Sequence, residues 1–155
     1  MNDTNCYIFV VTDTEYFSGL KCGAMEVYET RAAKKMWPLY DRTRFRTLVK
    51  SGDLCLFYIA GSKINAQSVV SSAVVTSNVA WTRRFGVVDS ESVLTDQPSS
   101  VLNLEKINTF SSPVKVRSVL DDLSFIPKNR EKWGTSFQGG VRQISHADYK
   151  VFVGS

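Results

Sequence analysis

Three apolar runs stand out along the chain, and each has the length and the β-branched content of a buried strand. They are residues 6–12 (CYIFVVT), 54–61 (LCLFYIAG) and 68–77 (SVVSSAVVTS). Short apolar runs bounded by turn residues are typical of strands that are covered on both faces. The loop SKINAQ separates the second run from the third. We therefore expect these two runs to pair as antiparallel strands.

The remaining segments carry weaker signals. Residues 25–36 (MEVYETRAAKKM) have helical character that ends before Pro38, and residues 42–50 indicate a short basic helix or turn. Residues 101–110 (VLNLEKINTF) alternate loosely as a strand, and residues 111–126 indicate a connection with a short helix capped around Ser118. Near the end of the chain, Ser145 is suited to cap a last helix, with Asp148 three residues later.

This order of elements predicts an α+β fold, in which short helices lie between the strands of a curved, barrel-like mixed sheet. A regular alternation of strands and helices, as in doubly wound α/β proteins, is not found. The 155 residues suffice for one domain, which we expect to span residues 1–155. The polar stretch DSESVLTDQPSS is expected to form a loop, and the role of residues 87–100 stays open.

Composition narrows the class of protein. With 43% hydrophobic and 22% charged residues, the chain resembles ordinary globular domains. No apolar run reaches the roughly 18 residues of a membrane span, and the first residues do not resemble a signal peptide. Cys6, Cys22 and Cys55 are odd in number and lack metal-ligand spacing. We expect reduced thiols, a cytoplasmic location, no membrane association and no metal or other cofactor.

Catalytic machinery is hard to find in the sequence. His146 is the single histidine, which argues against a histidine-based zinc site and a Ser-His-Asp triad. Cys6 and Cys55 lie in expected buried strands, where thiols are usually inert. The segment GSKINA lacks the spacing of a phosphate-binding Walker loop. The chain is therefore expected not to be an enzyme.

Charge and aromatic residues coincide in one segment. The net charge is +4, and residues 31–46 (RAAKKMWPLYDRTRFR) interleave six cations with Trp37, Tyr40 and Phe45. Cations neutralise phosphates and aromatic rings stack on bases, so this pattern favours a nucleic-acid partner. The alternative is a solvated basic face whose rings belong to the core. Basic residues also flank Trp81 and Trp133.

A family resemblance adds to this picture. The order of the segments YIFVVTD, MWPL, SGDLCLFYIAG, VVSSAVVTS, INTFSSPVKV and LSFIPKNREKWGTSFQGGVRQISHADY resembles EVE domains, members of the PUA-like superfamily that are related to YTH domains. The resemblance implies a barrel-like sheet of about six strands with helices packed around it. It also implies recognition of modified nucleobases, as in YTH relatives that hold a methylated adenine in an aromatic cage.

The resemblance also implies where a ligand binds. For the base pocket it points to Thr12, Asp13, Trp37, Trp81, Phe137, Gln138 and Gly139. For the phosphates, the basic residues that fit are Lys35, Arg42, Arg44, Arg46, Arg83, Lys128 and Arg142. The family often has Asn at the position of Asp13 and Trp at that of Phe17. Plain structural roles are the alternatives: Trp37 as a core ring, Asp13 as a cap and Trp133 as packing.

The resulting hypothesis is a reader module that accepts a flipped, modified base, either methylated cytosine or methylated adenine in DNA. Extruding a base from a duplex costs a few kcal/mol, and aromatic stacking returns roughly 1–3 kcal/mol per base. EVE-type domains occur beside modification-dependent restriction machinery, which implies a fused or neighbouring nuclease or ATPase component. The alternatives are an RNA-binding PUA-like module and a non-catalytic protein-interaction or regulatory domain.

Overall fold

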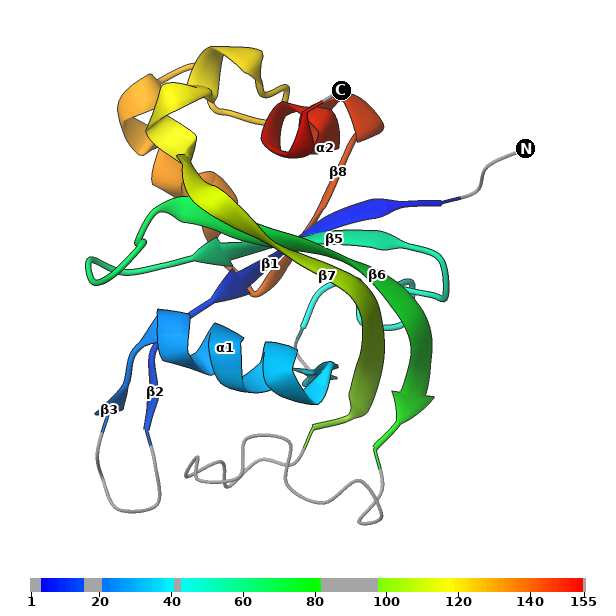
Figure 1. Cartoon of the computed structure of the whole chain (residues 1–155). Coiled ribbons are helices and arrows are strands. Elements are labelled where there is room, and N and C mark those ends of the chain that lie inside the picture. The colour runs from blue at the N-terminus through cyan, green and yellow to red at the C-terminus, as the bar shows by residue number, and fades with distance from the viewer. Residues whose placement is uncertain (1–3, 16–20, 41–42, 82–97, 155) are drawn as a thin grey trace.

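A computed structural model describes residues 4–15, 21–40, 43–81 and 98–154 of the chain. A six-stranded mixed sheet has the order β4-β7-β6-β5-β1-β8 and curls around itself (Figure 1). Its strands are β1 (Cys6–Val11), β4 (Met36–Leu39), β5 (Leu54–Ile59), β6 (Ser68–Ala80), β7 (Ser100–Lys115) and β8 (Val141–Ile144). The other elements are the ribbon β2 (Thr14–Glu15) and β3 (Lys21–Cys22), the helices α1 (Ala24–Lys34) and α2 (His146–Val153), and 3₁₀ segments at Val116–Ser118, Leu120–Asp122 and Arg130–Phe137. The α+β class with a curved sheet of about six strands is confirmed.

The three apolar runs form the middle of this sheet. β1 runs parallel to β5 and antiparallel to β8, and β5 pairs antiparallel with β6, as the short loop between them predicts. The register of β6 against β7 shifts three times, between Val69 and Ser71, Ser72 and Val74, and Val75 and Ser77. Such shifts bend a strand and increase its twist, so the long β6–β7 pair curves strongly (Figure 1).

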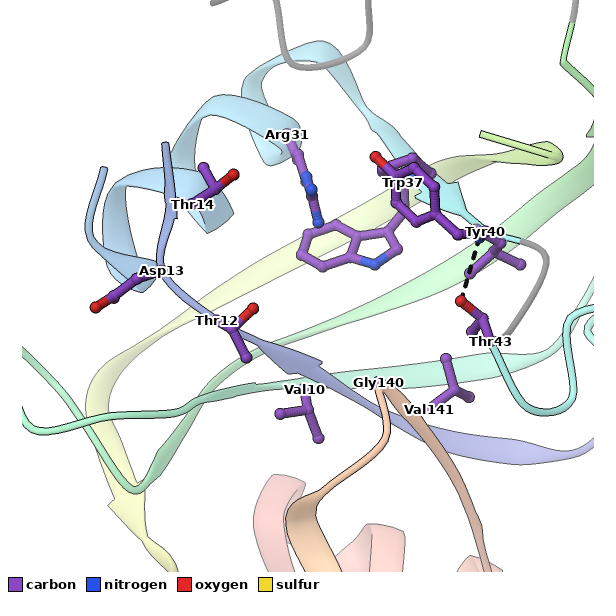
Figure 2. Close-up of a pocket in the computed structure, with 12 residues that line it drawn as sticks. Val10, Thr12, Asp13, Thr14, Arg31, Trp37, Tyr40, Thr43, Gly140 and Val141 are labelled. Carbon is purple, nitrogen blue, oxygen red and sulfur yellow. Dashed lines mark hydrogen bonds between the residues drawn. The ribbon is translucent and has the colours of Figure 1, made fainter. Parts of the chain in front are cut away.

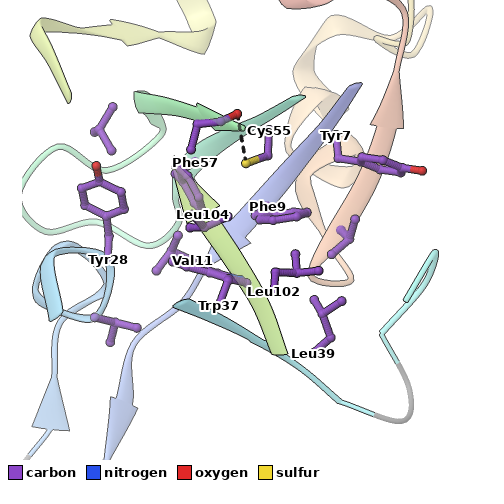
Figure 3. Packing of buried hydrophobic residues seen from close by; sticks show 14 of the residues in the cluster. Tyr7, Phe9, Val11, Tyr28, Trp37, Leu39, Cys55, Phe57, Leu102 and Leu104 are labelled. Atoms are coloured by element: carbon purple, nitrogen blue, oxygen red, sulfur yellow. Dashed lines mark hydrogen bonds between the residues drawn. The ribbon is translucent and has the colours of Figure 1, made fainter. Parts of the chain in front are cut away.

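The two faces of the sheet are covered by different elements. Helix α1 lies against one face, while α2 and the 3₁₀ segments lie against the other (Figure 1). Alternate side chains of each strand therefore enter two separate cores. On the α1 side, Tyr7, Phe9 and Val11 of β1 pack with rings from α1, β4 and β5 (Figure 3). On the α2 side, Cys6 and Ile8 pack with Leu56, Tyr58, Trp133, Phe137 and Phe152. We call these sets the α1-side cluster and the α2-side cluster.

Several local expectations are confirmed and others change. The helix expected at residues 25–36 is α1, residues 44–48 form a turn, and Ser145 caps α2 by accepting a hydrogen bond from the Asp148 N–H at 3.1 Å. The connection after residue 110 differs. β7 continues to Lys115, and the helix expected around Ser118 is replaced by single 3₁₀ turns. Strands β4 and β8 have no counterpart among the predicted elements. Within the described ranges, no helix is both long and apolar enough to cross a bilayer.

Candidate nucleic-acid interface

A cavity of about 230 Å³ lies where β1 ends, between β4 and the turn that precedes β8 (Figure 2). Sites for drug-sized ligands typically occupy about 300–1,000 Å³, so this cavity suits a smaller group. Its walls come from three parts of the chain that are distant in sequence, within residues 10–14, 31–43 and 140–141. They are formed by Val10, Thr12, Asp13, Thr14, Arg31, Trp37, Pro38, Leu39, Tyr40, Thr43, Gly140 and Val141.

Trp37 belongs both to this cavity and to the core. Lys35 ends α1 in the left-handed conformation (φ 55°), which turns the chain directly into β4, where Trp37 pairs with Leu102. The indole stands 4.6 Å from the ring centroid of Phe57 and 6.0 Å from that of Phe9. Only 4% of Trp37 is exposed. The indole is thus a rigid wall held by other aromatic rings.

Arg31 covers Trp37 from the last turn of α1. The central carbon of its guanidinium lies 4.7 Å from the centroid of the indole, which is a cation–π arrangement (Figure 2). The sequence pattern places Arg31 in the basic segment but not at the cavity. Its contact with Trp37 could have been inferred from its position, because it lies six residues before Trp37, near the end of the helix that leads directly into β4.

Asp13 has a structural role at the edge of the cavity. Its Oδ1 accepts a hydrogen bond from the backbone N–H of Ala24 at 2.8 Å, and its Oδ2 lies 3.6 Å from Nζ of Lys63. The N-cap residue of α1 is Gly23, which has no side chain to cap the helix, so Asp13 supplies the carboxylate. In Figure 2 this carboxylate points away from the indole. Thr12, one residue earlier, is exposed and lines the cavity.

The glycine pair before β8 supplies a wall without side chains. Gly139 and Gly140 have φ values of 88° and 86°, a region that favours glycine. The Gly140 carbonyl accepts the Val10 N–H at 2.7 Å, which ties this turn to β1. A Cβ at Gly140 would lie 3.9 Å from Cγ2 of Thr43. Gly140 therefore lines the cavity, while Gly139 and Gln138 are exposed beside it.

Two aromatic residues that the resemblance assigns to the pocket lie elsewhere. Phe137 is 4% exposed and belongs to the α2-side cluster, with its ring 4.4 Å from that of Tyr58. Trp81 follows β6, is half-buried and donates its backbone N–H to the Ser99 carbonyl at 3.1 Å. Neither residue is among those that line the cavity. Phe17 lies outside the described residues.

The basic residues expected to hold phosphates are spread over both sides of the sheet. Arg44 is exposed and adjoins Thr43, which lines the cavity, and Arg46 is half-buried in the same turn. Lys35 is exposed two residues before Trp37. Lys128 is exposed in the segment that covers the opposite face. Arg42 and Arg83 lie outside the described residues, as do residues 89–97 of the polar stretch.

Arg142 occupies an unusual environment on β8. Its guanidinium carbon lies 4.7 Å from the Phe125 ring centroid, and among the described residues its buried Nε has no hydrogen-bond partner. Burial lowers the pKa of Arg142, and the positive charge of Arg44 adds to this effect, whereas Asp148 opposes it. Arg142 is therefore a poorly solvated cation on the α2 side.

The fold also brings Cys6 to His146, a pairing that the sequence did not suggest. The Cys6 Sγ lies 3.6 Å from Nδ1 of His146, whose Nε2 donates to the Thr4 carbonyl at 2.7 Å. A carbonyl can only accept, so Nε2 is the donor in this bond. Cys6 is fully buried, and this burial, with the charge of Asp53, raises its pKa to about 11. A protonated, inaccessible thiol is a poor nucleophile.

Comparison of the sequence with known protein families gives no match, and neither does comparison with curated proteins. Solved structures share the fold. The human THYN1 protein, in complex with DNA containing 5-methylcytosine, superposes with a TM-score of 0.58 at 9% identity over 96% of this chain and 95% of that one.

Two further structures give similar values. A hypothetical protein from Leishmania major has a TM-score of 0.56 at 13% identity, with 96% of this chain and 92% of that chain covered. A protein from Rhodopseudomonas palustris has a TM-score of 0.55 at 9% identity, with 96% and 90% covered. At such identities the similarity establishes the fold alone. The curled, mixed six-stranded sheet with its helices is the PUA-like fold.

Proposed function

We propose that this chain is a non-catalytic nucleic-acid reader that takes a flipped, modified DNA base into the cavity beside Trp37. The observation that carries the proposal is the cavity itself, where an indole, an exposed threonine and a glycine backbone converge. The shared fold adds support, because the human protein of that fold is seen in complex with DNA containing 5-methylcytosine. Catalysis is not needed to explain any feature of the site.

The walls of the cavity suit a methylated base. Trp37 offers an aromatic surface, and stacking of a base on such a surface contributes roughly 1–3 kcal/mol. Val10, Leu39 and Val141 make part of the lining apolar. A buried methyl or methylene group contributes about 0.8 kcal/mol, so these walls favour a methylated base over its unmodified form.

The affinity for the nucleic acid would come mainly from its phosphates. Arg44 is exposed beside the lining residue Thr43, and Lys35 is exposed two residues before Trp37. Both can neutralise phosphates that flank a flipped base. Phosphate contacts position the strand without reading its sequence, so discrimination falls to the cavity. In a modification-dependent restriction system, such a module would direct a fused or neighbouring nuclease or ATPase component to its target.

The test is a binding panel. Duplexes of one sequence, carrying cytosine, 5-methylcytosine, 5-hydroxymethylcytosine or N6-methyladenine at one position, are compared by fluorescence anisotropy at fixed salt. A single-stranded RNA of the same sequence tests the RNA alternative. We expect at least one modified duplex to bind about fivefold or more tightly than the unmodified duplex, as one good base contact provides. Equal binding of all four duplexes would refute the proposal.

A matched pair of variants links this preference to the cavity. Thr12→Glu places a carboxylate in the cavity, and Thr135→Glu makes the same charge change at an exposed position on the α2 side. We expect the first variant to lose the preference for the modified duplex and the second to keep it. Since both threonines are exposed, both variants should fold, which thermal unfolding verifies. If the two variants behave alike, the base does not bind in this cavity.

A further inference from the structure

Charged side chains form part of the cavity wall. Of the described residues that line it, Arg31 and Asp13 carry charge. The Asp13 carboxylate is hydrogen-bonded to the N–H of Ala24 and lies near the Lys63 ammonium. The guanidinium of Arg31 lies over the indole of Trp37, with its central carbon 4.7 Å from the ring centroid. A planar group that touches Trp37 in this cavity therefore meets the cation of Arg31.

The neighbouring polar groups also include hydrogen-bond donors. The Thr12 side chain is exposed, and in Figure 2 its hydroxyl points toward the side of the cavity where the indole lies. Thr43 Oγ1 accepts the Tyr40 N–H at 3.1 Å, which leaves its own O–H as a donor. The Gly140 carbonyl already accepts the N–H of Val10. The cavity thus offers hydrogen-bond donors beside the guanidinium of Arg31.

The methylated bases differ in how well they match such a site. A guanidinium is a planar fork of donors and pairs best with two adjacent acceptors. The pairing edge of cytosine carries O2 and N3 side by side, and a 5-methyl group leaves both unchanged. On adenine, the acceptors N1 and N7 each lie next to the exocyclic amino group. This neighbour is a donor, so neither edge presents two adjacent acceptors.

We propose that Arg31 is the specificity-determining residue of this cavity and that it selects methylated cytosine over methylated adenine. The proposal rests on the proposed function and deepens it. Trp37 provides the surface on which any base stacks. Arg31 moves from the indole to the acceptor edge of the base and thereby decides which base is retained.

The experiment measures the affinity ratio between a 5-methylcytosine duplex and an N6-methyladenine duplex of otherwise identical sequence. It compares wild-type protein with Arg31→Gln, Arg31→Lys and a control, Arg117→Gln. Arg117 is a matched control because its guanidinium carbon lies 5.8 Å from the ring centroid of Trp133, on the α2 side. Each variant is also titrated at several salt concentrations, and its folding is checked by urea unfolding.

We expect the wild-type protein to favour 5-methylcytosine and Arg31→Gln to lower the ratio by about 5- to 150-fold, the range for a two-acceptor pairing. Arg31→Lys should retain little of the preference for 5-methylcytosine, because an ammonium cannot form the planar fork of donors. Arg117→Gln should leave the ratio unchanged. The slope of log affinity against log salt should stay nearly the same in Arg31→Gln as in the wild-type protein.

Three outcomes would overturn the assignment. Equal weakening of both duplexes, with the salt slope reduced by about one, identifies Arg31 as a phosphate contact. Tighter binding of both duplexes by Arg31→Gln shows that the guanidinium only competes for the indole. An unchanged ratio, together with a retained preference for modified DNA, shows that another group reads the base. In all three the proposed function survives, whereas loss of any modified-base preference in the wild-type protein defeats both proposals.

Discussion

The two sides of the sheet present the same pair of residues with different consequences. On the α1 side Arg31 lies over Trp37, and on the α2 side Arg117 lies over Trp133, at 4.7 and 5.8 Å from the ring centroids. Both tryptophans are buried, at 4% and 7% exposure. Only Trp37 lines the cavity described above. A ring with a neighbouring cation is therefore not enough to make a binding site.

The difference lies in what surrounds each ring. Around Trp133 the α2 side is filled by side chains, since Phe137 packs on Tyr58 and stands edge-on to Trp133 at 5.9 Å. Beside Trp37 the wall includes the backbone of Gly140, which has no side chain to fill the space. The two sides thus differ in packing: side chains surround Trp133, whereas a glycine backbone forms part of the wall beside Trp37.

The largest expected effects come from removing either tryptophan, and the two variants should differ in DNA binding. Trp133→Ala and Trp37→Ala should each lower the free energy of unfolding by about 3–5 kcal/mol, because each removes a large buried ring. Urea unfolding measures this loss. The fraction that remains folded should keep its preference for modified DNA in Trp133→Ala and lose it in Trp37→Ala. Trp37→Phe, which keeps a ring in the core, provides a milder version of the second variant. Equal loss of preference in both would remove the functional distinction between the sides.

The next prediction concerns the hydrogen bonds that close the α2 side. Asp148 accepts from the Ser124 N–H at 2.8 Å, the Ser124 hydroxyl at 2.6 Å and the Ser145 hydroxyl at 2.9 Å. Burial opposes ionisation, but these bonds outweigh it and lower the pKa of Asp148. Asp148→Ala should therefore cost about 1.5–3 kcal/mol of stability at neutral pH.

The contribution of Asp148 to stability depends on pH, and the lowered pKa fixes the direction. The stabilisation by Asp148 is fully present above the pKa of the unfolded chain, about 3.9, and is lost as the pH falls through the lower pKa of the folded state. Urea unfolding at several pH values should show wild-type protein and Asp148→Ala converging in acid. A constant difference between them across this range would contradict the assigned role, and modified-base preference at neutral pH serves as the control.

A smaller effect is expected for the adjacent glycines. Gly139→Ala and Gly140→Ala should each cost about 1–2 kcal/mol, because both residues have positive φ values, 88° and 86°. Their effects on binding should differ. Gly140→Ala places a methyl group in the cavity wall, at 3.9 Å from Cγ2 of Thr43, and should weaken binding of the modified duplex. Gly139→Ala should not. Equal effects on binding would show that this wall does not touch the base.

The smallest expected effect is electrostatic. Arg44 is exposed beside the cavity-lining residue Thr43, and Lys128 is exposed in the segment that covers the α2 side. Arg44→Gln should reduce the slope of log affinity against log salt by about one, whereas Lys128→Gln should leave the slope unchanged. If Lys128→Gln has the larger effect, the nucleic acid follows the opposite face of the protein.

Much of the fold could be predicted because its central strands are continuous apolar runs. The strands β1, β5 and β6 and the helices α1 and α2 follow from local pattern and from a cap such as Ser145. Strands β4 and β8 could not be predicted in this way. Each has four residues, β4 contains Pro38, and β8 follows two glycines, so their strand conformation comes from pairing with β7 and β1.

The candidate site could be predicted in part, for a related reason. Trp37 and Thr12 adjoin recognisable elements, so their positions follow once β1 and α1 are placed. Phe137 and Gly140 are close in sequence, yet Phe137 enters the α2-side cluster while Gly140 lines the cavity. Which side of the sheet each of these two residues faces depends on tertiary packing and cannot be read from the local sequence. The same limit kept Arg31 out of the set of expected pocket residues.

The most direct test of the central claim follows the indole N–H signals of the tryptophans by NMR as DNA is added. Trp81→Phe and Trp133→Phe assign the signals of Trp37 and Trp133. During titration with a duplex that carries 5-methylcytosine, the Trp37 signal should shift or broaden at concentrations where the unmodified duplex has little effect, and the Trp133 signal should stay in place. An unmoved Trp37 signal at saturation, or equal shifts of both signals, would contradict binding of the base in the cavity on the α1 side.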